Sequence, residues 1–202
     1  MLKRRSRNKL TSVLDLGFED AQRLTALALR HPEKKFMGIE VTKAKGVVTR
    51  RPNLKLIWGD ALKKLKRLRS QSVKIVTADF LFSEMKVGNV SETRELELLS
   101  MLGIRPTEEH MGKYHKKRKQ IAEQVKRVLV PNGRFVVVGY KADLELTKEL
   151  LRDSGFTYKV FPVPESEMGK TKFLKIIQER LKEAPQHRER MQPMKIVARK
   201  RQ

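Results

Sequence analysis

The order of apolar segments predicts a doubly wound α/β fold, a seven-stranded, mostly parallel sheet with helices on both faces and an antiparallel last strand. Short apolar segments of strand length alternate with segments whose apolar residues recur at helical spacing. In addition, Val13–Asp20 has the pattern of a buried strand that runs into a tight turn and then a helix. In doubly wound proteins, such a turn is where a nucleotide-like ligand binds.

In the first half of the chain we expect four strands with helices between them. The expected strands are Val13–Gly17, Lys35–Val41, Leu54–Trp58 and Val73–Ala78. One helix is expected over Ala21–Arg30, because Leu24, Leu27 and Ala28 share one side and His31-Pro32 follows. A second is expected over Ala61–Arg69, where three leucines line one side and basic residues cover the rest.

A polar insertion near residues 86–115 follows the fourth strand. Within it, Asn89 and Glu92 favour a helix start, and Gly103 a stop after Met101. Apolar spacing then predicts a helix over Lys116–Leu129, and Pro131-Asn132-Gly133 predicts a turn. The remaining expected elements are a strand over Arg134–Tyr140, a helix capped by Asp143 and ended by Gly155, a strand over Thr157–Val163, a helix over Lys170–Glu183 and a final strand over Met194–Arg199.

We interpret the chain as a single domain over residues 11–202, with insertions near 86–115 and 164–193 and a basic N-terminal arm over 1–10. The apolar content, 39% of 202 residues, is enough for one core of this size. Because the last two strands flank the second insertion, we expect them to pair as antiparallel neighbours.

Lys and Arg total 46 against 23 Asp and Glu, a formal charge of +23. An excess of this size favours polyanions, so we expect RNA as the partner. A charged surface that only serves solvation would carry more interspersed acids. The candidate RNA-binding residues form three clusters: Lys3, Arg4, Arg5 and Arg7; Lys63, Lys64 and Arg67; and Lys116, Lys117, Arg118 and Lys119.

Several other classes of protein are disfavoured by the residue types present. The chain has no cysteine, and its four histidines are far apart in the sequence, so we expect no disulfide and no metal site. No apolar run approaches the ~20 residues that a membrane span requires. We therefore expect a cytoplasmic protein that does not bind membranes.

Acidic residues recur at the ends of the expected strands, where ligands of parallel sheets bind. Asp15 and Gly17 follow the first strand, Glu40 lies at the end of the second, Asp60 follows the third and Asp79 the fourth. A carboxylate after the second strand can accept the hydroxyls of a ribose. Asp60 can accept an adenine amine or can cap the helix that follows it.

In this order of motifs the chain resembles the class I S-adenosylmethionine-dependent methyltransferases, which have a Rossmann-like fold. The resemblance covers 13–199 and rests on Asp15-x-Gly17, Glu40, Gly59-Asp60 and Leu129-Val130-Pro131-Asn132-Gly133, which is similar to the family's L-x-P-G-G motif. In detail, the segments 16–20 and 38–41 look most like those of tRNA guanine-N7 methyltransferases.

The resemblance implies S-adenosylmethionine as the cofactor and RNA, either tRNA or rRNA, as the substrate. It implies that Gly17 and the turn after it, including Phe18, approach the methionine part, that Glu40 holds the ribose and that Asp60 with Ala61 contacts the adenine. Asp79 would then meet the methyl acceptor. Phe80 or Phe82 can stack on a base, although at least one of them is expected in the core.

The chain departs from the family pattern at two places. The family's second and third glycines fall on Glu19 and Ala21, and only Asp79 and an aromatic residue match its motif after strand four. A non-catalytic RNA- or ribosome-binding protein with this fold is therefore the competing interpretation. A dehydrogenase is disfavoured, because the G-x-x-G part of its phosphate-binding turn does not follow Gly17.

Overall fold

The computed structural model describes residues 10–18, 21–41, 51–79, 108–164, 166, 182 and 192–200. Its strands are β1 (Thr11–Leu16), β2 (Lys35–Glu40), β3 (Leu54–Trp58), β4 (Val73–Asp79), β5 (Leu129–Tyr140), β6 (Phe156–Pro162) and β7 (Pro193–Lys200). Its helices are α1 (Gln22–Arg30), α2 (Ala61–Lys66), α4 (Glu108–Val128) and α5 (Leu144–Asp153), with a 3-10 turn, Lys141–Asp143, before α5.

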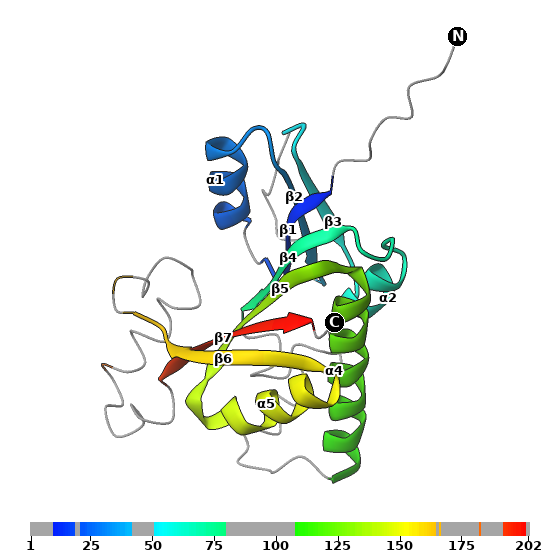
Figure 1. Ribbon diagram of the computed structural model, residues 1–202, viewed down its shortest axis with the longest axis vertical. Coiled ribbons are helices and arrows are strands. Elements are labelled where there is room, and N and C mark those ends of the chain that lie inside the picture. The colour runs from blue at the N-terminus through cyan, green and yellow to red at the C-terminus, as the bar shows by residue number, and fades with distance from the viewer. Residues whose placement is uncertain are drawn as a thin grey trace.

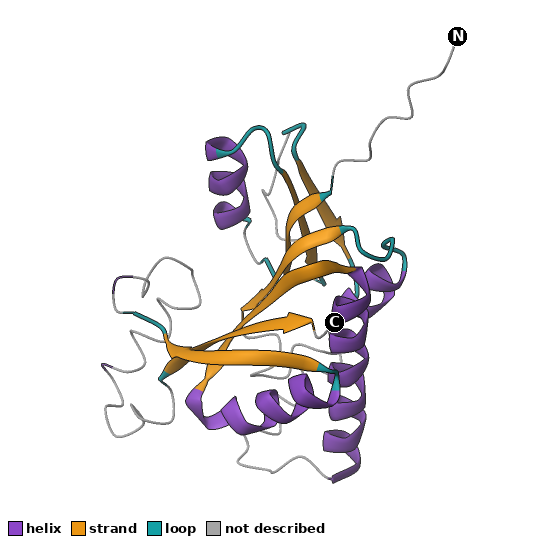
Figure 2. Ribbon diagram, in the orientation of Figure 1, coloured by secondary structure: helices purple, strands orange, loops and turns teal. Residues whose placement is uncertain are grey.

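These strands form one seven-stranded sheet in the order β3-β2-β1-β4-β5-β7-β6 (Figure 1). The pairs between β1, β2, β3, β4 and β5 are parallel, whereas β7 runs antiparallel to both β5 and β6. Helices lie on both sides of the sheet, with α1 apart from α4 and α5 (Figure 2). The predicted fold class, including the antiparallel last strand, is confirmed.

Most expected elements are present, with shifted ends. Helix α4 begins at Glu108 rather than at Lys116, so it extends over the last residues of the insertion expected near 86–115. Asp143 does precede α5, but its side chain makes no capping hydrogen bond there. The helices expected over 89–101 and 170–183, and the basic arm over 1–10, lie outside the described residues apart from Leu10 and Lys182.

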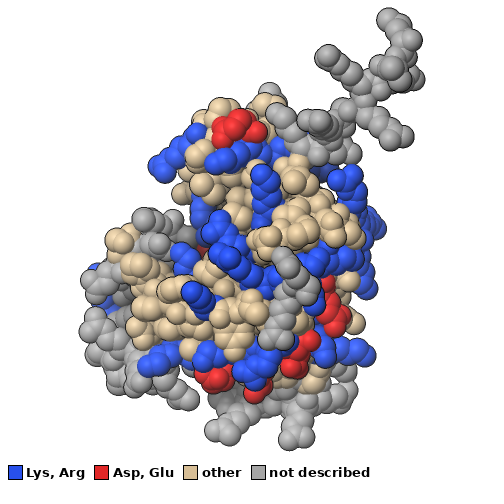
Figure 3. Space-filling model, viewed as in Figure 1, with Lys and Arg blue, Asp and Glu red and all other residues tan. Residues whose placement is uncertain are grey.

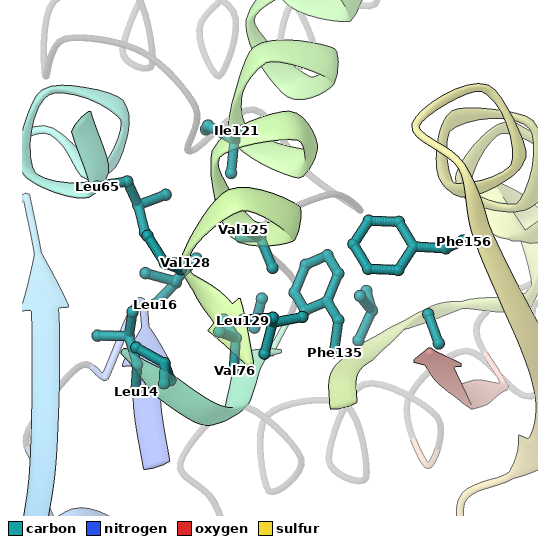
Figure 4. Close-up of a cluster of buried hydrophobic side chains, with 14 of the residues drawn as sticks. Leu14, Leu16, Leu65, Val76, Ile121, Val125, Val128, Leu129, Phe135 and Phe156 are labelled. Carbon is teal, nitrogen blue, oxygen red and sulfur yellow. The ribbon is translucent and has the colours of Figure 1, made fainter. Parts of the chain in front are cut away.

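The larger core lies between the sheet and the helices α2, α4 and α5. Leu14 and Leu16 of β1, Val76 of β4 and Phe135 of β5 project from the sheet into this core. Figure 4 shows them below the apolar side of α4, which contributes Ile121, Val125 and Val128. The rings of Phe135 and Phe156 meet at 5.9 Å between centroids. The helical spacing in α4 therefore serves one continuous core.

A smaller core lies on the opposite face, under α1. Because side chains alternate along a strand, the residues that neighbour the larger-core positions point to this other face. Leu24 and Ala28 of α1 pack there with Phe36 of β2 and Leu54 of β3. These contacts hold α1 over the β3-β2-β1 half of the sheet, with its first turn near the carboxyl ends of β1 and β4.

The Pro131-Asn132-Gly133 turn lies within β5, where the register with β4 shifts: Val73 pairs with Leu129, but Ile75 pairs with Arg134. Asn132 has φ 61°, a left-handed conformation that turns and bulges favour. A Cβ on Gly133 would lie 2.9 Å from the Val130 carbonyl oxygen and 3.1 Å from that of Lys74. Close packing of backbone thus explains the glycine that the sequence motif contains.

Arg127 of α4 holds the carboxyl end of α2. Its Nη1 donates to the Leu68 carbonyl oxygen and its Nη2 to that of Leu65, both at 2.8 Å. Its Nε donates to Gln124 Oε1 at 2.8 Å, which fixes the plane of the guanidinium. A cation at a helix C-terminus satisfies carbonyl groups that have no partner within the helix.

We predict that Arg127→Met lowers the free energy of unfolding by about 2 kcal/mol, because two charged hydrogen bonds to half-buried carbonyl groups are lost while the aliphatic packing is kept. Urea denaturation followed by circular dichroism measures this loss. Lys119→Met, on an exposed position of the same helix, should change stability by less than about 0.5 kcal/mol. Equal losses in the two variants would contradict the role of Arg127.

Candidate functional site

The candidate site lies where the carboxyl ends of β1 and β4 meet. These strands are neighbours in the sheet, and the helices that come next in the described chain lie on opposite faces, α1 after β1 and α4 after β4. In open parallel sheets, this reversal of connections opens a crevice in which ligands bind. The register places Asp15 beside Thr77, with Asp79 two residues further along the same face.

Arg23, in the first turn of α1, joins the two strand ends. Its Nη1 donates to Asp79 Oδ2 at 2.6 Å, and its Nη2 donates to Asp15 Oδ1 at 2.8 Å. The same Nη2 lies 3.2 Å from Thr77 Oγ1, and the Thr77 hydroxyl donates to Asp15 Oδ1 at 2.6 Å. One guanidinium thus bridges two carboxylates, and we call Asp15, Arg23 and Asp79 the ion triad.

The members of the ion triad differ in their exposure. The side chain of Asp15 is 4% exposed, that of Asp79 is 15% exposed and that of Arg23 is 35% exposed. A ligand can therefore reach Arg23 and Asp79, whereas the shielded Asp15 affects a ligand through Arg23, which it holds in place. With two carboxylates and one guanidinium, the ionised triad carries one net negative charge.

Burial dominates the acid–base behaviour of both carboxyls in the triad. It raises the pKa of Asp15, and the charge of Arg23 and the hydroxyl of Thr77 offset this only in part. The pKa of Asp79 is likewise raised by burial, against the opposing effect of Arg23, and the nearby Asp15 raises it further. Lys195 of β7 lowers the pKa of Asp79, so its ammonium acts on the same carboxylate.

Arg23 and Thr77 were not among the residues that the sequence analysis selected. Arg23 stands among polar residues at a helix start, and Thr77 lies inside an apolar strand segment, so neither belongs to a motif. The available signal was the number of acids: two carboxylates at adjacent strand ends require a cation nearby if they are to be buried.

The turn after β1 begins with Gly17 at φ 78°, and its backbone N–H donates to the Ile39 carbonyl oxygen at 2.9 Å. A Cβ on Gly17 would meet no atom of the described residues within 4 Å, so the space beside it is open on their side. Ala21 was expected inside the helix, but it precedes α1 in a left-handed conformation, φ 60°. The position where the resemblance places the third glycine is thus held by an alanine in a backbone conformation that favours glycine.

Phe18 follows Gly17 but turns into the smaller core. It is 6% exposed and meets Trp58 edge to face, with 5.0 Å between the ring centroids. The same ring lies where a Cβ on Gly38 would be. Phe18 therefore packs in the smaller core beneath α1 and does not line the open space beside Gly17.

Glu40 ends β2 within electrostatic range of Asp15, whose pKa it raises. Its Oε1 accepts a hydrogen bond from the Val41 backbone N–H at 2.7 Å, which orients the carboxylate. Its carbonyl oxygen accepts from the Gly59 N–H, also at 2.7 Å, and this bond joins the ends of β2 and β3. The predicted residues Asp15, Gly17 and Glu40 thus lie together at the carboxyl ends of β1 and β2.

Asp60 is the N-cap residue of α2, as the alternative interpretation of this residue expected. Its Oδ1 accepts from the Lys63 backbone N–H at 2.9 Å, and its Oδ2 lies 3.1 Å from Lys117 Nζ. Burial would raise the pKa of Asp60, but the Lys63 N–H and the Lys117 ammonium together lower it below its usual value. Ala61, the next residue, is half-buried against the larger core.

The basic residues of α2 and α4 differ in accessibility. Lys63, Arg67, Lys116 and Lys119 are exposed, Lys64 is half-buried, Lys117 pairs with Asp60, and Arg118 is only 5% exposed. Of the predicted cluster on α4, only Lys116 and Lys119 are thus placed to meet a macromolecule. Figure 3 shows Lys and Arg spread over the visible surface, with Asp and Glu confined to a few places.

The remaining predicted site residues lie outside the described part of the chain: Lys3, Arg4, Arg5, Arg7, Phe80 and Phe82. Glu19, the other departure from the family pattern, lies outside it too. In the described ranges, no helix has the length and apolar character that a membrane crossing requires. Within the same ranges, no three His, Asp or Glu side chains are grouped as metal ligands would be.

Several solved structures that are similar to this chain are methyltransferases. The chain superposes on a SAM-dependent methyltransferase from Archaeoglobus fulgidus with a TM-score of 0.54 at 13% identity, covering 96% of this chain and 87% of that one. For phosphoethanolamine N-methyltransferase 2 of Haemonchus contortus, in complex with S-adenosyl-L-methionine, the TM-score is 0.57 at 13% identity, with 96% of this chain and 49% of that chain covered. This chain therefore spans about half of the Haemonchus enzyme.

A third similar structure, the [4+2]-cyclase SpnF, has a TM-score of 0.57 at 14% identity, over 94% of this chain and 74% of that one. No protein-family model matches the sequence, and no curated protein matches it. The chain thus has the Rossmann-like fold of the class I S-adenosylmethionine-dependent methyltransferases. Because the same fold also occurs in a cyclase, its activity has to be argued from the site.

We predict that Arg23→Gln lowers the free energy of unfolding by about 3 kcal/mol at neutral pH, because two buried carboxylates lose their shared cation. Without Arg23 the pKa values of Asp15 and Asp79 rise further above the ordinary 3.8. The folded variant then binds protons more readily than the unfolded chain, so its stability deficit shrinks as the pH falls from about 8 to about 5.

Thermal unfolding of Arg23→Gln and of the wild type across this pH range measures the effect. Arg30→Gln, at an exposed position of the same helix, is the matched control and should show a small deficit that is independent of pH. A deficit of Arg23→Gln that grows toward low pH would contradict the buried ion triad.

Proposed function

We propose that this protein is an S-adenosylmethionine-dependent methyltransferase that acts on RNA, either tRNA or rRNA, in the cytoplasm. The observation that supports this most is the set of acids at the carboxyl ends of β1, β2, β3 and β4 beside the open turn at Gly17. Among RNA methyltransferases, the segments around Gly17 and Gly38 favour the tRNA guanine-N7 type.

The side chains at this edge fit the chemistry of the cofactor. Glu40 offers an oriented carboxylate to the ribose hydroxyls, and the open space at Gly17 admits a ligand close to the backbone. The partly exposed guanidinium of Arg23 is suited to a carboxylate, and Asp79 beside it to an ammonium group. Asp60 can accept from an adenine amine only while sharing its oxygens with Lys63 and Lys117.

When bound, S-adenosylmethionine supplies a methyl group on a sulfonium ion, which a nucleophile on the acceptor base can attack directly. The residues of this chain therefore have to align the acceptor and exclude water more than transfer protons. Asp79 is the group placed to orient an acceptor, because it ends β4 and is partly exposed. Where the acceptor nitrogen bears a hydrogen, that proton leaves after transfer, and the raised pKa of Asp79 suits this carboxylate to accept it; guanine N7 bears no hydrogen and needs only alignment.

RNA as the acceptor is supported by the net charge of +23 and by the exposed basic residues of α2 and α4. These are Lys63, Arg67, Lys116 and Lys119. Lys64 is a further candidate, because its side chain lies against Gly59 at the end of β3. We assign the N-terminal cluster to RNA as well, on its sequence alone.

A non-catalytic RNA- or ribosome-binding protein is the second candidate function. One observation favours it: the side chain of Arg23 already bridges Asp15 and Asp79 at the carboxyl ends of β1 and β4. If the ion triad is purely structural, it occupies space that a cofactor would need, and the protein keeps the fold and the positive charge without the chemistry.

Isothermal titration calorimetry with S-adenosylmethionine separates the two functions. The enzyme binds the cofactor and transfers labelled methyl groups to tRNA or rRNA. Folded protein that shows no heat with the cofactor and no methyl transfer, while it binds RNA in a salt-dependent manner, would instead be the non-catalytic binder.

We predict that Gly17→Ala weakens cofactor binding and lowers the free energy of unfolding by about 1–2 kcal/mol, because a Cβ is unfavourable at φ 78° and projects into the open space. Gly155→Ala is the matched control: φ is 73° there, and the added methyl meets the flexible end of Lys126 far from the site. Calorimetry should show wild-type affinity for Gly155→Ala only. Equal cofactor affinity in the two variants would contradict the proposed cofactor position.

A further inference from the structure

On the α1 side of the sheet, β5, β7 and β6 lie beyond α1, whose Arg23 contacts β4 at Thr77 and Asp79. There, three rows of side chains cross strands β4, β5, β7 and β6 in register. The rows are Ile75, Arg134, Arg199 and Thr157; Thr77, Val136, Val197 and Lys159; and Asp79, Val138, Lys195 and Phe161. The described helices α4 and α5 pack against the opposite face. We call the part of this surface on β5, β7 and β6 the platform.

The platform combines positive charge with apolar surface. Arg134, Lys159 and Arg199 are exposed, and Lys195 is half-buried. The only acid in the three rows is Asp79, at the end nearest the ion triad. Three half-buried valines lie between the basic side chains: Val136, Val138 and Val197. A surface that served only to keep the protein in solution would not combine apolar side chains with charge of a single sign.

An aromatic ring stands at the edge of the platform. Phe161 of β6 is 45% exposed, and in the register it pairs with Lys195. An exposed ring on a sheet, next to cationic side chains, suits an unpaired nucleic-acid base, which stacks on the ring while the cations meet its phosphates. A duplex hides the faces of its bases, so the ring favours a single strand.

A second copy of the chain suits this surface poorly. A two-fold contact would place the same patch of each copy against the other, so Arg134, Lys159 and Arg199 would oppose one another. Like charges in such a contact cost several kcal/mol. The polyanion that the net charge of +23 favours fits the platform without this repulsion.

The platform is continuous with the candidate site through its third row. Asp79 is followed across the sheet by Val138, Lys195 and Phe161, and the Lys195 ammonium acts on the Asp79 carboxylate. With strands about 4.8 Å apart, Phe161 lies roughly 14 Å across the sheet from Asp79. A few nucleotides of extended chain cover this distance.

We propose that the platform binds single-stranded RNA and leads it to the Asp79 end of the crevice, with a base on Phe161 and phosphates on Arg134, Lys159 and Arg199. The RNA substrate class of this inference rests on the proposed function, but the binding surface is distinct from the basic clusters on α2 and α4. The recognised ligand is thus an unpaired segment of RNA that reaches over the β6 edge of the sheet.

The test measures the binding of a fluorescein-labelled oligouridine of about 12 nucleotides, and of a hairpin duplex, by fluorescence anisotropy at several salt concentrations. The triple variant Arg134→Thr, Lys159→Thr, Arg199→Thr replaces exposed strand residues with a good strand former, so the fold is expected to be kept. We expect it to bind oligouridine at least about tenfold more weakly, with a salt slope reduced by about 2, since each phosphate contact on a single strand contributes about 0.7.

The matched control removes the same charge outside the platform through Arg51→Thr, Lys55→Thr and Arg69→Thr, which are exposed residues in or near β3 and α2. It should weaken binding less than about threefold. Equal losses in the two triple variants, or equal affinity of the wild type for hairpin and oligouridine, would overturn the platform.

Phe161→Ser tests stacking separately from charge. It should weaken oligouridine binding roughly tenfold with an unchanged salt slope, because one base loses its stacking partner. A changed slope with little loss of affinity would contradict the stacking role.

Cofactor calorimetry on the same preparations distinguishes this inference from the proposed function. If the platform variant loses RNA affinity while the wild type shows no heat with S-adenosylmethionine, the platform stands and the enzyme proposal fails. If the wild type methylates RNA and the platform variant does so with unchanged RNA affinity, the enzyme proposal stands and the platform fails.

Discussion

The arrangement of the site depends on one buried electrostatic constraint, the bridging of Asp15 and Asp79 by Arg23. Two carboxylates at adjacent strand ends cannot both be ionised in a poorly solvated place without a cation between them. Arg23 comes from α1, so this requirement fixes the first turn of that helix over the junction of β1 and β4. The apolar contacts of Leu24 and Ala28 then fix the rest of the helix.

The same constraint decides which chemistry the crevice can accept. Asp15 is shielded, so its contribution to a ligand is indirect: it holds the guanidinium and adds negative potential behind it. Asp79 and Arg23 are the accessible pair, and they offer an anion and a cation about one hydrogen bond apart. An amino acid moiety, with its ammonium and carboxylate, is complementary to such a pair. A ligand without one of these charges would leave a group of the pair desolvated and unmatched.

Most of the fold could be predicted because its signals are local. Strands such as Leu54–Trp58 and helices such as α4 reveal themselves by apolar spacing, and Asp60 by its place before a helix. The ends of the elements were less predictable. The start of α4 at Glu108 was missed because the polar residues of its first two turns carry no apolar pattern. Arg23 could not be found in this way, since its partners Asp15 and Asp79 lie 8 and 56 residues away and only the folded sheet brings them together. Ala21 was misplaced for another reason: alanine has a high helix propensity, whereas the turn before α1 requires a left-handed backbone at this residue.

The position of β7 has a consequence for how the molecule can be made. This strand is the last in the described chain, yet it lies inside the sheet, between β5 and β6. During synthesis, β6 has no neighbour to pair with until Pro193–Lys200 has emerged from the ribosome. Until then, the apolar side of β5 and the ring of Phe156 have an incomplete surface to pack on. The nascent chain can assemble the β3-β2-β1-β4 half early, but the other half closes only after β7 has been synthesised, and its unpaired strand edges are exposed to other chains and to chaperones for that interval.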